Sequence, residues 1–208
     1  MQHDSSLGSS AAAAKRTKGA IRSQLRAKLN SLSLVQRFSV SALACDRLRA
    51  DEIWSRSDSI LGYFPLADEL DVRPLLATAL AAGKTVALPR FNTETSAYEA
   101  AHVRDLDRDL HPGRFGIREP SAACPVVALN RLDLVMVPGV GFDLSGHRLG
   151  RGKGFYDRML VQVSGCKCGV AFDEQVVAAL PVEPHDIVLD CIVTPTRWLT
   201  FGPRAVLK

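Results

Sequence analysis

The chain has 208 residues, of which 47% are apolar and 23% charged, and 26 basic against 22 acidic side chains give a net charge of +4. This length suits one domain, the composition excludes disordered, collagen-like, coiled-coil and disulfide-scaffold proteins, and no apolar run approaches the ~20 residues of a membrane-spanning helix. The small positive charge suits a small anionic ligand and lies far below that of a dedicated nucleic-acid binder, so we expect neither a nucleic acid nor a membrane as partner.

The N-terminal segment is small, polar and without periodicity. We therefore expect residues 1–14 to be a tail, either disordered or appended to the natural chain, and residues 15–208 to form a single domain. Between Met1 and Ala44 one acidic residue stands against seven bases, a composition that also occurs in organellar transit peptides.

From Lys18 onward the chain has the periodicity of an amphipathic helix, which is a better interpretation than a transit peptide. Its apolar stripe is formed by Ile21, Leu25, Leu29 and Leu32. Lys18, Arg22 and Arg26 recur at every fourth position, so they share a second face of this helix. From spacing alone, that face is either a solvated charged surface or part of an anion site.

The following segments alternate between helix and strand patterns. Ser33 and Gln36 form a capping-box pattern that opens a second helix, which continues past Phe38. Asp71 is a candidate cap for a third helix, which Gly83 would close. Short apolar runs predict strands at 59–64, 85–88, 98–103, 133–137, 169–172 and 187–193.

Near-continuous apolar strands alternating with helices indicate a parallel sheet that is buried on both sides. We expect an α/β fold of three layers, a mostly parallel central sheet with helices on both faces, in a single domain. Pro89 should end its strand, and residues 111–120 should form a loop. Ligands of such sheets bind beyond the carboxyl ends of strands, in the loops after Phe64, Leu88 and Val137.

The five cysteines are odd in number and scattered along the chain. Cys166 and Cys168 have no second pair and no histidine at ligand spacing, so we do not expect a zinc site. We interpret the thiols as reduced and the compartment as cytoplasmic.

The stretch from Pro138 to Arg158, PGVGFDLSGHRLGRGKGFYDR, carries the strongest chemical signal. Glycines and cations alternate in it: Gly146, Arg148, Gly150, Arg151, Gly152, Lys153 and Gly154. Glycines let backbone amides approach a ligand, and cations supply positive charge to phosphate oxygens. A helix starting near Phe155 would add an N-terminus that favours anions. These three features indicate a polyphosphate site.

Two standard phosphate motifs do not fit this stretch. A P-loop has four residues between its first glycine and the pair Gly-Lys, which Ser or Thr follows. Here five residues separate Gly146 from Gly152, and Gly154 stands where the P-loop has its hydroxyl residue. Gly150, Gly152 and Gly154 form G-x-G-x-G, which is not the dinucleotide-binding pattern. A flexible, charged surface loop is the alternative interpretation.

Candidate metal ligands lie in and after the same stretch. Asp157, in the first turn of the expected helix, could cap that helix or help to hold magnesium. A second carboxylate could come from Asp186 or Asp190. Taken singly, each of the three could equally be a cap or turn residue.

Together these residues resemble the 5-formyltetrahydrofolate cyclo-ligase family, also called methenyltetrahydrofolate synthetases. The glycine-rich stretch carries the resemblance most specifically, and the order of motifs holds from about residue 18 to 194. Phe155 stands where the family often has tyrosine. Supporting motifs are Lys18-x-x-x-Arg22, Asp68-Glu69, Leu88-Pro89-Arg90, Phe115-Gly116-Ile117-x-Glu119-Pro120 and His185-Asp186-x-x-x-Asp190.

The resemblance implies ATP-dependent cyclisation of 5-formyltetrahydrofolate to methenyltetrahydrofolate, with release of ADP and phosphate. Transfer of the terminal phosphoryl group to the formyl oxygen would give an imino-phosphate, which the neighbouring nitrogen then attacks. Such a reaction requires positioning and charge stabilisation rather than a protein nucleophile. The implied partners are small molecules, with Mg²⁺ as cofactor, and we expect a monomer.

The resemblance also implies a role for each matched residue. For ATP binding these are Lys18, Arg22, Arg148, Gly150, Arg151, Gly152, Lys153, Gly154, Phe155 and Tyr156, of which Arg148, Arg151 and Lys153 would be catalytic. Substrate binding falls to Phe64, Glu69, Phe115, Arg151, Lys153 and Tyr156, and metal binding to Asp157 and Asp186. Glu69 would hydrogen-bond the pterin ring. Phe64 and Phe115 would pack on the ring, or else be core residues.

Two other function classes stay open at this point. A non-catalytic relative could bind nucleotide, folate or RNA without turnover, although the aromatic residues do not interleave with the basic ones as in single-strand binders. A small-molecule kinase would share the phosphate site and leave a stable phosphorylated product.

Overall fold

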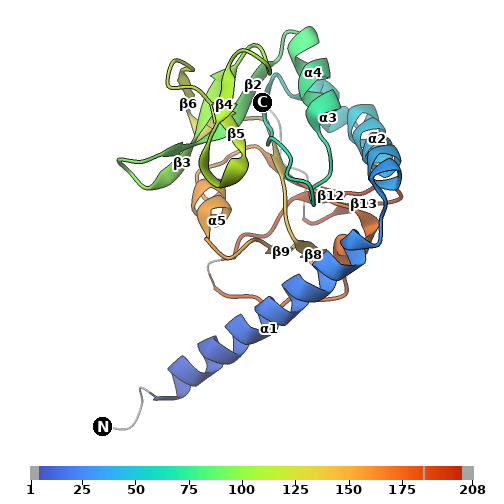
Figure 1. Cartoon of the computed structure of the whole chain (residues 1–208), viewed down its shortest axis with the longest axis vertical. Coiled ribbons are helices and arrows are strands. Elements are labelled where there is room, and N and C mark those ends of the chain that lie inside the picture. The colour runs from blue at the N-terminus through green and yellow to red at the C-terminus, as the bar shows by residue number, and fades with distance from the viewer. Residues whose placement is uncertain (1–4, 185, 203–208) are drawn as a thin grey trace.

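The computed structural model describes residues 5–184 and 186–202, with the side chains of residues 5–16 and of Phe115 excepted (Figure 1). Its α-helices are α1 (Ser5–Asn30), α2 (Leu34–Ala50), α3 (Glu52–Arg56), α4 (Arg73–Ala81) and α5 (Phe155–Leu160). Its 3₁₀ helices are η1 (Arg114–Gly116), η2 (Leu129–Arg131) and η3 (Asp173–Gln175). Its strands are β1 (Ser59–Leu61), β2 (Thr85–Asn92), β3 (Ala97–Val103), β4 (Leu110–Pro112), β5 (Arg118–Pro120), β6 (Val126–Val127), β7 (Leu134–Val137), β8 (Gly141–Asp143), β9 (Arg148–Leu149), β10 (Cys166–Val170), β11 (Val176–Val177), β12 (Cys191–Val193) and β13 (Trp198–Thr200).

Most of the longer strands join one sheet in the order β13-β12-β10-β7-β1-β2-β3-β6. The inner strands β12, β10, β7, β1 and β2 are parallel, whereas β13, β3 and β6 pair antiparallel at the two edges. The chain order reverses between β1 and β7, because β2 lies on one side of this pair and β10 on the other. Sheets with this order bind ligands in the crevice at the reversal, beyond the carboxyl ends of the strands.

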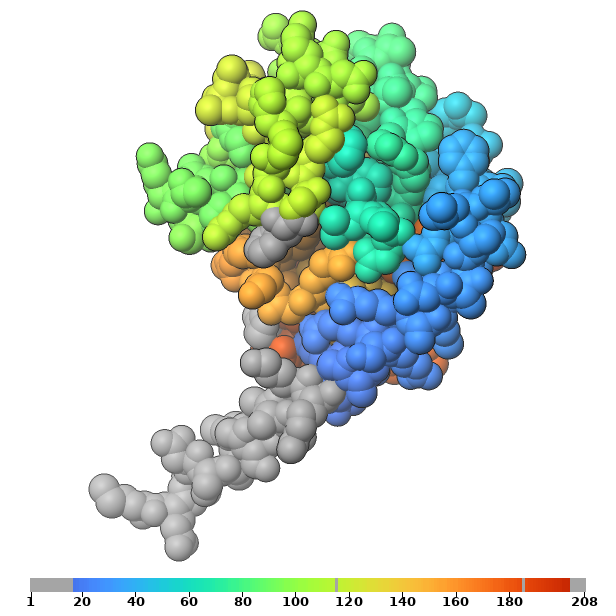
Figure 2. All heavy atoms as spheres, in the orientation of Figure 1, coloured from blue at the N-terminus to red at the C-terminus, as the bar shows by residue number. Residues whose placement is uncertain are grey.

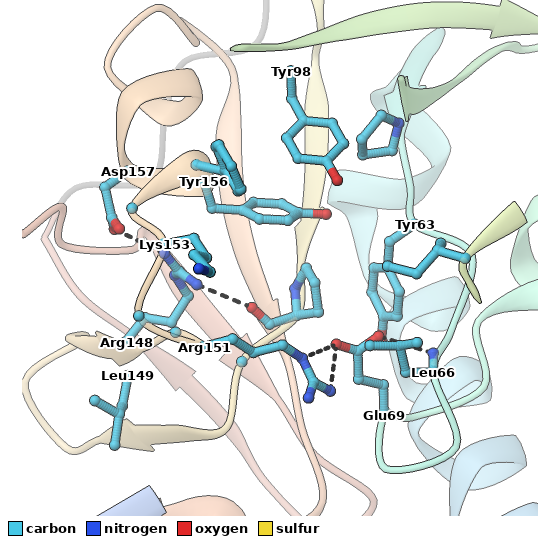
Figure 3. Close-up of a pocket in the computed structure, with 18 of the residues that line it drawn as sticks. Tyr63, Leu66, Glu69, Tyr98, Arg148, Leu149, Arg151, Lys153, Tyr156 and Asp157 are labelled. Carbon is cyan, nitrogen blue, oxygen red and sulfur yellow. Dashed lines mark hydrogen bonds and ion pairs between the residues drawn. The ribbon is translucent and has the colours of Figure 1, made fainter. Parts of the chain in front are cut away.

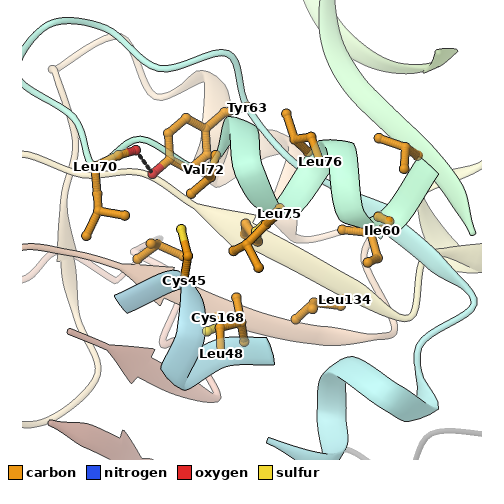
Figure 4. Close-up of a cluster of buried hydrophobic side chains, with 14 of the residues drawn as sticks. Cys45, Leu48, Ile60, Tyr63, Leu70, Val72, Leu75, Leu76, Leu134 and Cys168 are labelled. Carbon is orange, nitrogen blue, oxygen red and sulfur yellow. Dashed lines mark hydrogen bonds between the residues drawn. The ribbon is translucent and has the colours of Figure 1, made fainter. Parts of the chain in front are cut away.

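The central strand β7 shows why the sheet is covered on both faces. Leu134 and Met136 pack into one buried cluster with side chains from α1 to α4 (Figure 4). Val135 and Val137 point the other way, into a second cluster with side chains of α5. Successive strand residues alternate between faces, so a continuous apolar run needs an apolar layer on each. The expected three-layer α/β fold is confirmed.

Helix α1 has the predicted amphipathic character and starts earlier than predicted. Leu25 and Leu29 are buried, 2% and 1% exposed, against the rest of the domain. The backbone is helical from Ser5, where we expected a tail over residues 1–14. The alanine run at 11–14 has the highest intrinsic helix propensity, which favours continuation of the helix. Residues 1–4 lie outside the described residues.

The helix ends follow the sequence signals only in part. Ser33 and Gln36 form the predicted capping box at the start of α2. Gly83, with φ +73°, follows α4 as predicted. No side chain caps the N-terminus of α4; Asp71 instead accepts a hydrogen bond from the backbone N–H of Arg73. Phe38 of α2 is 68% exposed, so the face of α2 that packs on the sheet is formed by Ser41, Ala44, Cys45 and Leu48.

Pro89 does not end its strand, contrary to our expectation. Pairing of β2 with β1 stops at Ala87, and from there on β2 pairs only with β3. The N–H of Phe91 points away from β3, to the carboxylate of Glu119. The nitrogen of Pro89 faces the same side, because residues two apart in a strand point alike. Its missing N–H therefore costs no ladder bond.

Other strand boundaries differ from the predicted ones. The strand expected at 169–172 lies at Cys166–Val170, and the one expected at 187–193 is confined to Cys191–Val193. Residues 111–120, expected as a loop, form most of the hairpin of β4 and β5 around η1. Within the described residues, no helix is both long and apolar enough to cross a bilayer.

All five cysteines are free and buried. Cys166 Sγ and Cys191 Sγ lie 3.7 Å apart on neighbouring strands. Contact with Cys191 and burial raise the pKa of the Cys166 thiol. Such thiols stay protonated and act as small apolar packing groups.

Gly165, just before β10, is required by a close backbone contact. A Cβ there would lie 2.0 Å from the carbonyl oxygen of Leu132 and 2.5 Å from that of Asp133. Because these are backbone atoms of the chain entering β7, Gly165→Ala should lower the free energy of unfolding by about 1–3 kcal/mol in urea titrations. Gly19→Ala, in α1 with open space around it, is the control and should raise stability by roughly 0.5–1 kcal/mol. Equal stability of the Gly165 variant and the wild type would contradict this.

Candidate active site

A cavity of about 850 Å³ opens at the carboxyl ends of β1 and β7, where the strand order reverses. Its walls come from α1, the segment after β1, the hairpins β2–β3 and β4–β5, and the glycine-rich stretch, which adjoin one another on the face drawn in Figure 2. The predicted site residues that line it are Lys18, Arg22, Phe64, Glu69, Arg148, Gly150, Arg151, Gly152, Lys153, Gly154, Phe155, Tyr156, Asp157 and Asp186.

One sequence candidate lies away from the cavity, and two others are not described. Asp190 is not among the residues described as lining the cavity; its carboxylate accepts a hydrogen bond from the N–H of Lys167 at 2.7 Å. The side chain of Phe115 and the whole of His185 lie outside the described residues. Of the two alternatives for the second acidic residue, Asp186 is therefore the one at the cavity.

The glycine-rich stretch is not a loop throughout, because part of it belongs to a small sheet. Its first half folds into β8 and β9, which pair antiparallel, and β11 pairs with β8. The buried carboxylate of Asp143 accepts hydrogen bonds from the N–H groups of Ser145, His147 and Leu180. Gln175 Nε2 donates to the carbonyl of Gly139 at 2.7 Å.

Two glycines of the second half adopt backbone angles that other residues avoid. Gly152 has φ +94° and Gly154 has φ +63°, in the left-handed region where a Cβ is strained. Gly154 directly precedes α5, which begins at Phe155 as predicted and is only six residues long. Arg22 Nε donates to the carbonyl of Gly150 at 2.8 Å, which ties α1 to this part of the stretch.

Arg148 and Asp157 form a buried ion pair at the base of the cavity. Arg148 Nη2 lies 2.8 Å from Asp157 Oδ1, and the arginine side chain is 5% exposed. The guanidinium also lies 5.4 Å from the ring centre of Tyr156. Arg148 thus connects β9 with the first turn of α5. The arginine that we expect to bind phosphate forms an ion pair with Asp157, which we expect to bind metal.

Arg151 crosses the cavity to the segment after β1 (Figure 3). Its Nη2 contacts Asp68, and the same atom lies 3.1 Å from Glu69 Oε1. Glu69 Oε2 accepts a hydrogen bond from the N–H of Leu66 at 3.0 Å. Burial raises the pKa of Glu69, although the Leu66 N–H and the charge of Arg151 work against this. The carboxylate is therefore fixed in position and shared with one cation.

Lys18 lies between two acidic side chains of the segment before β12. Its Nζ is 2.7 Å from Glu183 and 2.9 Å from Asp186. Burial alone would lower the pKa of Lys18, but its hydrogen bonds to Asp186 and Glu183 outweigh burial and raise it. Lys18 therefore stays charged, and the carboxylates of Glu183 and Asp186 both contact its ammonium group.

Lys153 differs from these three cations. It is exposed at the rim of the cavity, and none of the described residues forms a hydrogen bond or ion pair with its ammonium group. A cation at a cavity without a protein partner is available to an anionic ligand at no cost in broken ion pairs.

Aromatic side chains form the apolar walls. Phe155 meets Phe91 and Tyr98 edge to face, with ring centres 5.7 and 5.2 Å apart. Phe64 packs between two guanidinium groups, those of Arg118 at 5.4 Å and Arg73 at 6.0 Å. Tyr156 is partly buried, and this burial, followed by the charge of Glu69, raises its pKa. The hydroxyl groups of Tyr98 and Tyr156 both point into the space drawn in Figure 3.

Sequence reasoning did not assign a role to several residues that line the cavity. They include Tyr63, Leu66, Tyr98, Arg118, Glu119 and Glu183. Glu119 lies inside a motif that carried the family resemblance, and Glu183 lies three residues before Asp186. Tyr98 had no such signal, because only the pairing of β3 with β2 brings it to the cavity.

Comparison with known proteins places this chain among folate enzymes of one family. The sequence profile of the 5-formyltetrahydrofolate cyclo-ligase family matches residues 14–195. A 5-formyltetrahydrofolate cyclo-ligase of Mus musculus is 30% identical over 83% of this chain and 91% of the mouse protein. One of Escherichia coli K12 is 33% identical over 83% of this chain and 97% of its own length.

Solved structures agree with the fold. The NMR structure of 5,10-methenyltetrahydrofolate synthetase of Aquifex aeolicus is 33% identical, with a TM-score of 0.81 over 92% of this chain and 96% of the other. A Mycoplasma pneumoniae 5,10-methenyltetrahydrofolate synthetase has the same fold, with 24% identity and a TM-score of 0.69 over 86% and 98% of the two chains. The profile spans nearly the whole chain, including every part of the cavity wall, and this chain therefore belongs to the 5-formyltetrahydrofolate cyclo-ligase family.

Proposed function

We propose that this protein cyclises 5-formyltetrahydrofolate to methenyltetrahydrofolate, with hydrolysis of ATP to ADP and phosphate. Family membership supports the overall reaction. The observation that carries the proposal is that one cavity holds Lys153, which has no partner among the described residues, together with the carboxylate of Glu69, which Arg151 contacts. A phosphate donor and a substrate with N–H donors can therefore meet there.

The folate would bind on the side of Glu69. A pterin ring offers an amino group and a ring N–H side by side, which suits a fixed carboxylate. Glu69 is fixed by the N–H of Leu66, and the aromatic side chain of Phe64 lines the same cavity. This arrangement favours a flat ring with adjacent donors over a flexible substrate.

The triphosphate would bind along the glycine-rich stretch, where the charges must exchange partners. Lys18 holds Asp186, and Arg151 holds Glu69. When phosphate oxygens arrive, these cations can turn to them, and the released carboxylates become free for other ligands. Each cation thus moves from one anion to another, so its charge is never left buried alone.

The acidic residues fit a magnesium ion held with the nucleotide. Glu183 and Asp186 converge on the Lys18 ammonium, so their oxygens are close enough to share a cation. Magnesium in proteins takes one or two carboxylates together with phosphate oxygens and water. We propose Asp186, with Asp157, as the residues that would hold it, and the ion would supply positive charge to the phosphates.

The chemistry then requires little beyond charge and alignment. The formyl oxygen of the folate attacks the terminal phosphorus, ADP leaves, and the resulting imino-phosphate carries a good leaving group. The neighbouring N–H nitrogen of the folate bonds to the formyl carbon and loses its proton, and phosphate departs with that proton. Lys153 and Arg151 would neutralise the charge on the transferred group during both steps.

The test is one incubation of the purified protein with ATP, Mg²⁺ and 5-formyltetrahydrofolate. We expect the near-ultraviolet absorbance of the methenyl product to appear, with one ADP and one phosphate for each methenyl group. A stable phosphorylated folate would instead identify a kinase. Binding without any product would identify a non-catalytic relative, and either result would overturn the proposal.

A further inference from the structure

Glu119, in β5, has one carboxylate oxygen with no assigned partner. The side chain is 8% exposed and lines the cavity. Its Oε2 accepts a hydrogen bond from the N–H of Phe91 at 3.0 Å. Its Oε1 is shielded from solvent and has no hydrogen-bond partner anywhere in the described part of the chain. Buried polar atoms are nearly always paired, so an orphaned one at a ligand cavity calls for a ligand.

The structure holds this carboxylate firmly in place. Glu119 pairs with His111 across the β4–β5 hairpin. Gly113 packs directly on its side chain, since a Cβ there would lie 2.6 Å from Glu119 Cγ. Together with the N–H of Phe91, these contacts leave the side chain little freedom to turn toward solvent.

The surroundings favour a donor rather than an anion as the missing partner. The Tyr98 hydroxyl lies close to the Glu119 carboxylate without forming a hydrogen bond to Oε1. Burial, then the negative charge of this carboxylate and its contact with the hydroxyl group, raise the pKa of Tyr98. The same charge would repel the phosphates of a nucleotide. Within the described chain, no three potential metal ligands cluster, so nothing prepares Oε1 for a metal ion. A neutral molecule with N–H groups is a ligand that suits this oxygen.

We propose that Glu119 is a second folate-binding residue, whose Oε1 accepts a hydrogen bond from an N–H of the reduced pterin or its linker. This inference depends on the proposed function. Glu69 and Glu119 come from opposite walls, one after β1 and the other in β5, and would bind different donors of the same molecule. A folate has enough donors for both, because its ring and linker carry N–H groups beyond the edge that suits Glu69.

The experiment compares Glu119→Leu, Glu119→Gln and wild type by calorimetric titration with 5-formyltetrahydrofolate, and by steady-state KM for both substrates. We expect the leucine variant to bind the folate at least about tenfold more weakly, with the KM for ATP unchanged. The glutamine variant keeps an oxygen acceptor and should recover most of the affinity.

A matched control separates binding from stability. Glu99→Gln breaks the ion pair with Arg90 at 2.6 Å in the β2–β3 hairpin, and Glu99 does not line the cavity. It should lower the Tm and leave folate affinity unchanged. Wild-type affinity in the leucine variant, or an equal loss for ATP and folate, would overturn the role of Glu119. If the wild-type protein did not bind 5-formyltetrahydrofolate, the proposed function itself would be overturned. This outcome differs from the two outcomes that would overturn only the role of Glu119.

Discussion

Replacing Lys153 by alanine is expected to lower kcat by about 100- to 1,000-fold, the usual loss when one group that stabilises transition-state charge is removed. Among the cations at the cavity, Lys18, Arg148 and Arg151 already hold acidic partners. Lys153 has no such partner in the described structure, so its charge is committed only when the phosphates arrive. The measurement is kcat from the rate of methenyl formation at saturating ATP and folate.

The fold should survive this substitution, which keeps the result interpretable. Lys153 is exposed, and Gly152 and Gly154 beside it determine the backbone of the stretch. Lys28→Ala, which removes an exposed cation of α1 that does not line the cavity, is the charge-matched control and should keep full activity. If the Lys153 variant turned over as fast as this control, the lysine would have no part in phosphoryl transfer.

The central strands could be predicted from the sequence, whereas the small ones could not. Leu134 to Val137 read as a buried strand because both faces of a parallel strand meet apolar layers. Strands β9 and β11 have two residues each, too few to show any periodicity. Their pairing depends on the carboxylate of Asp143, which accepts bonds from residues as distant in sequence as Leu180.

The candidate site, like the fold, could be predicted only in part from the sequence. The glycines and cations of one continuous stretch predicted a phosphate site, because their spacing is itself the signal. Contacts between distant segments left no such pattern: the ion pairs Lys18–Glu183 and Arg151–Glu69 join residues 165 and 82 positions apart. That Lys18 and Arg151 hold acidic residues therefore emerges only from the folded chain.

Replacing Glu69 by alanine is the second substitution for which we expect a large effect. It should weaken binding of the folate and not that of ATP. A hydrogen bond to a charged group contributes ~1.5–3 kcal/mol, so loss of this carboxylate should weaken 5-formyltetrahydrofolate binding by about 10- to 100-fold. ATP affinity should stay the same or rise, because Arg151 loses one of its two acidic partners and turns more readily to phosphate. Separate titrations with the folate and with ATP measure both effects.

The pH dependence of folate binding gives an independent check on Glu69. Burial raises the pKa of this carboxyl group, and only the ionised form offers two acceptors to a pterin. Folate affinity should therefore fall as the pH is lowered through this raised pKa, at a higher pH than for an exposed glutamate. Glu69→Gln, which cannot ionise, should bind weakly at every pH and lack this decline, whereas Asp68→Asn should retain it. Loss of ATP affinity in place of folate affinity would show that Glu69 serves the nucleotide and that the pterin binds elsewhere.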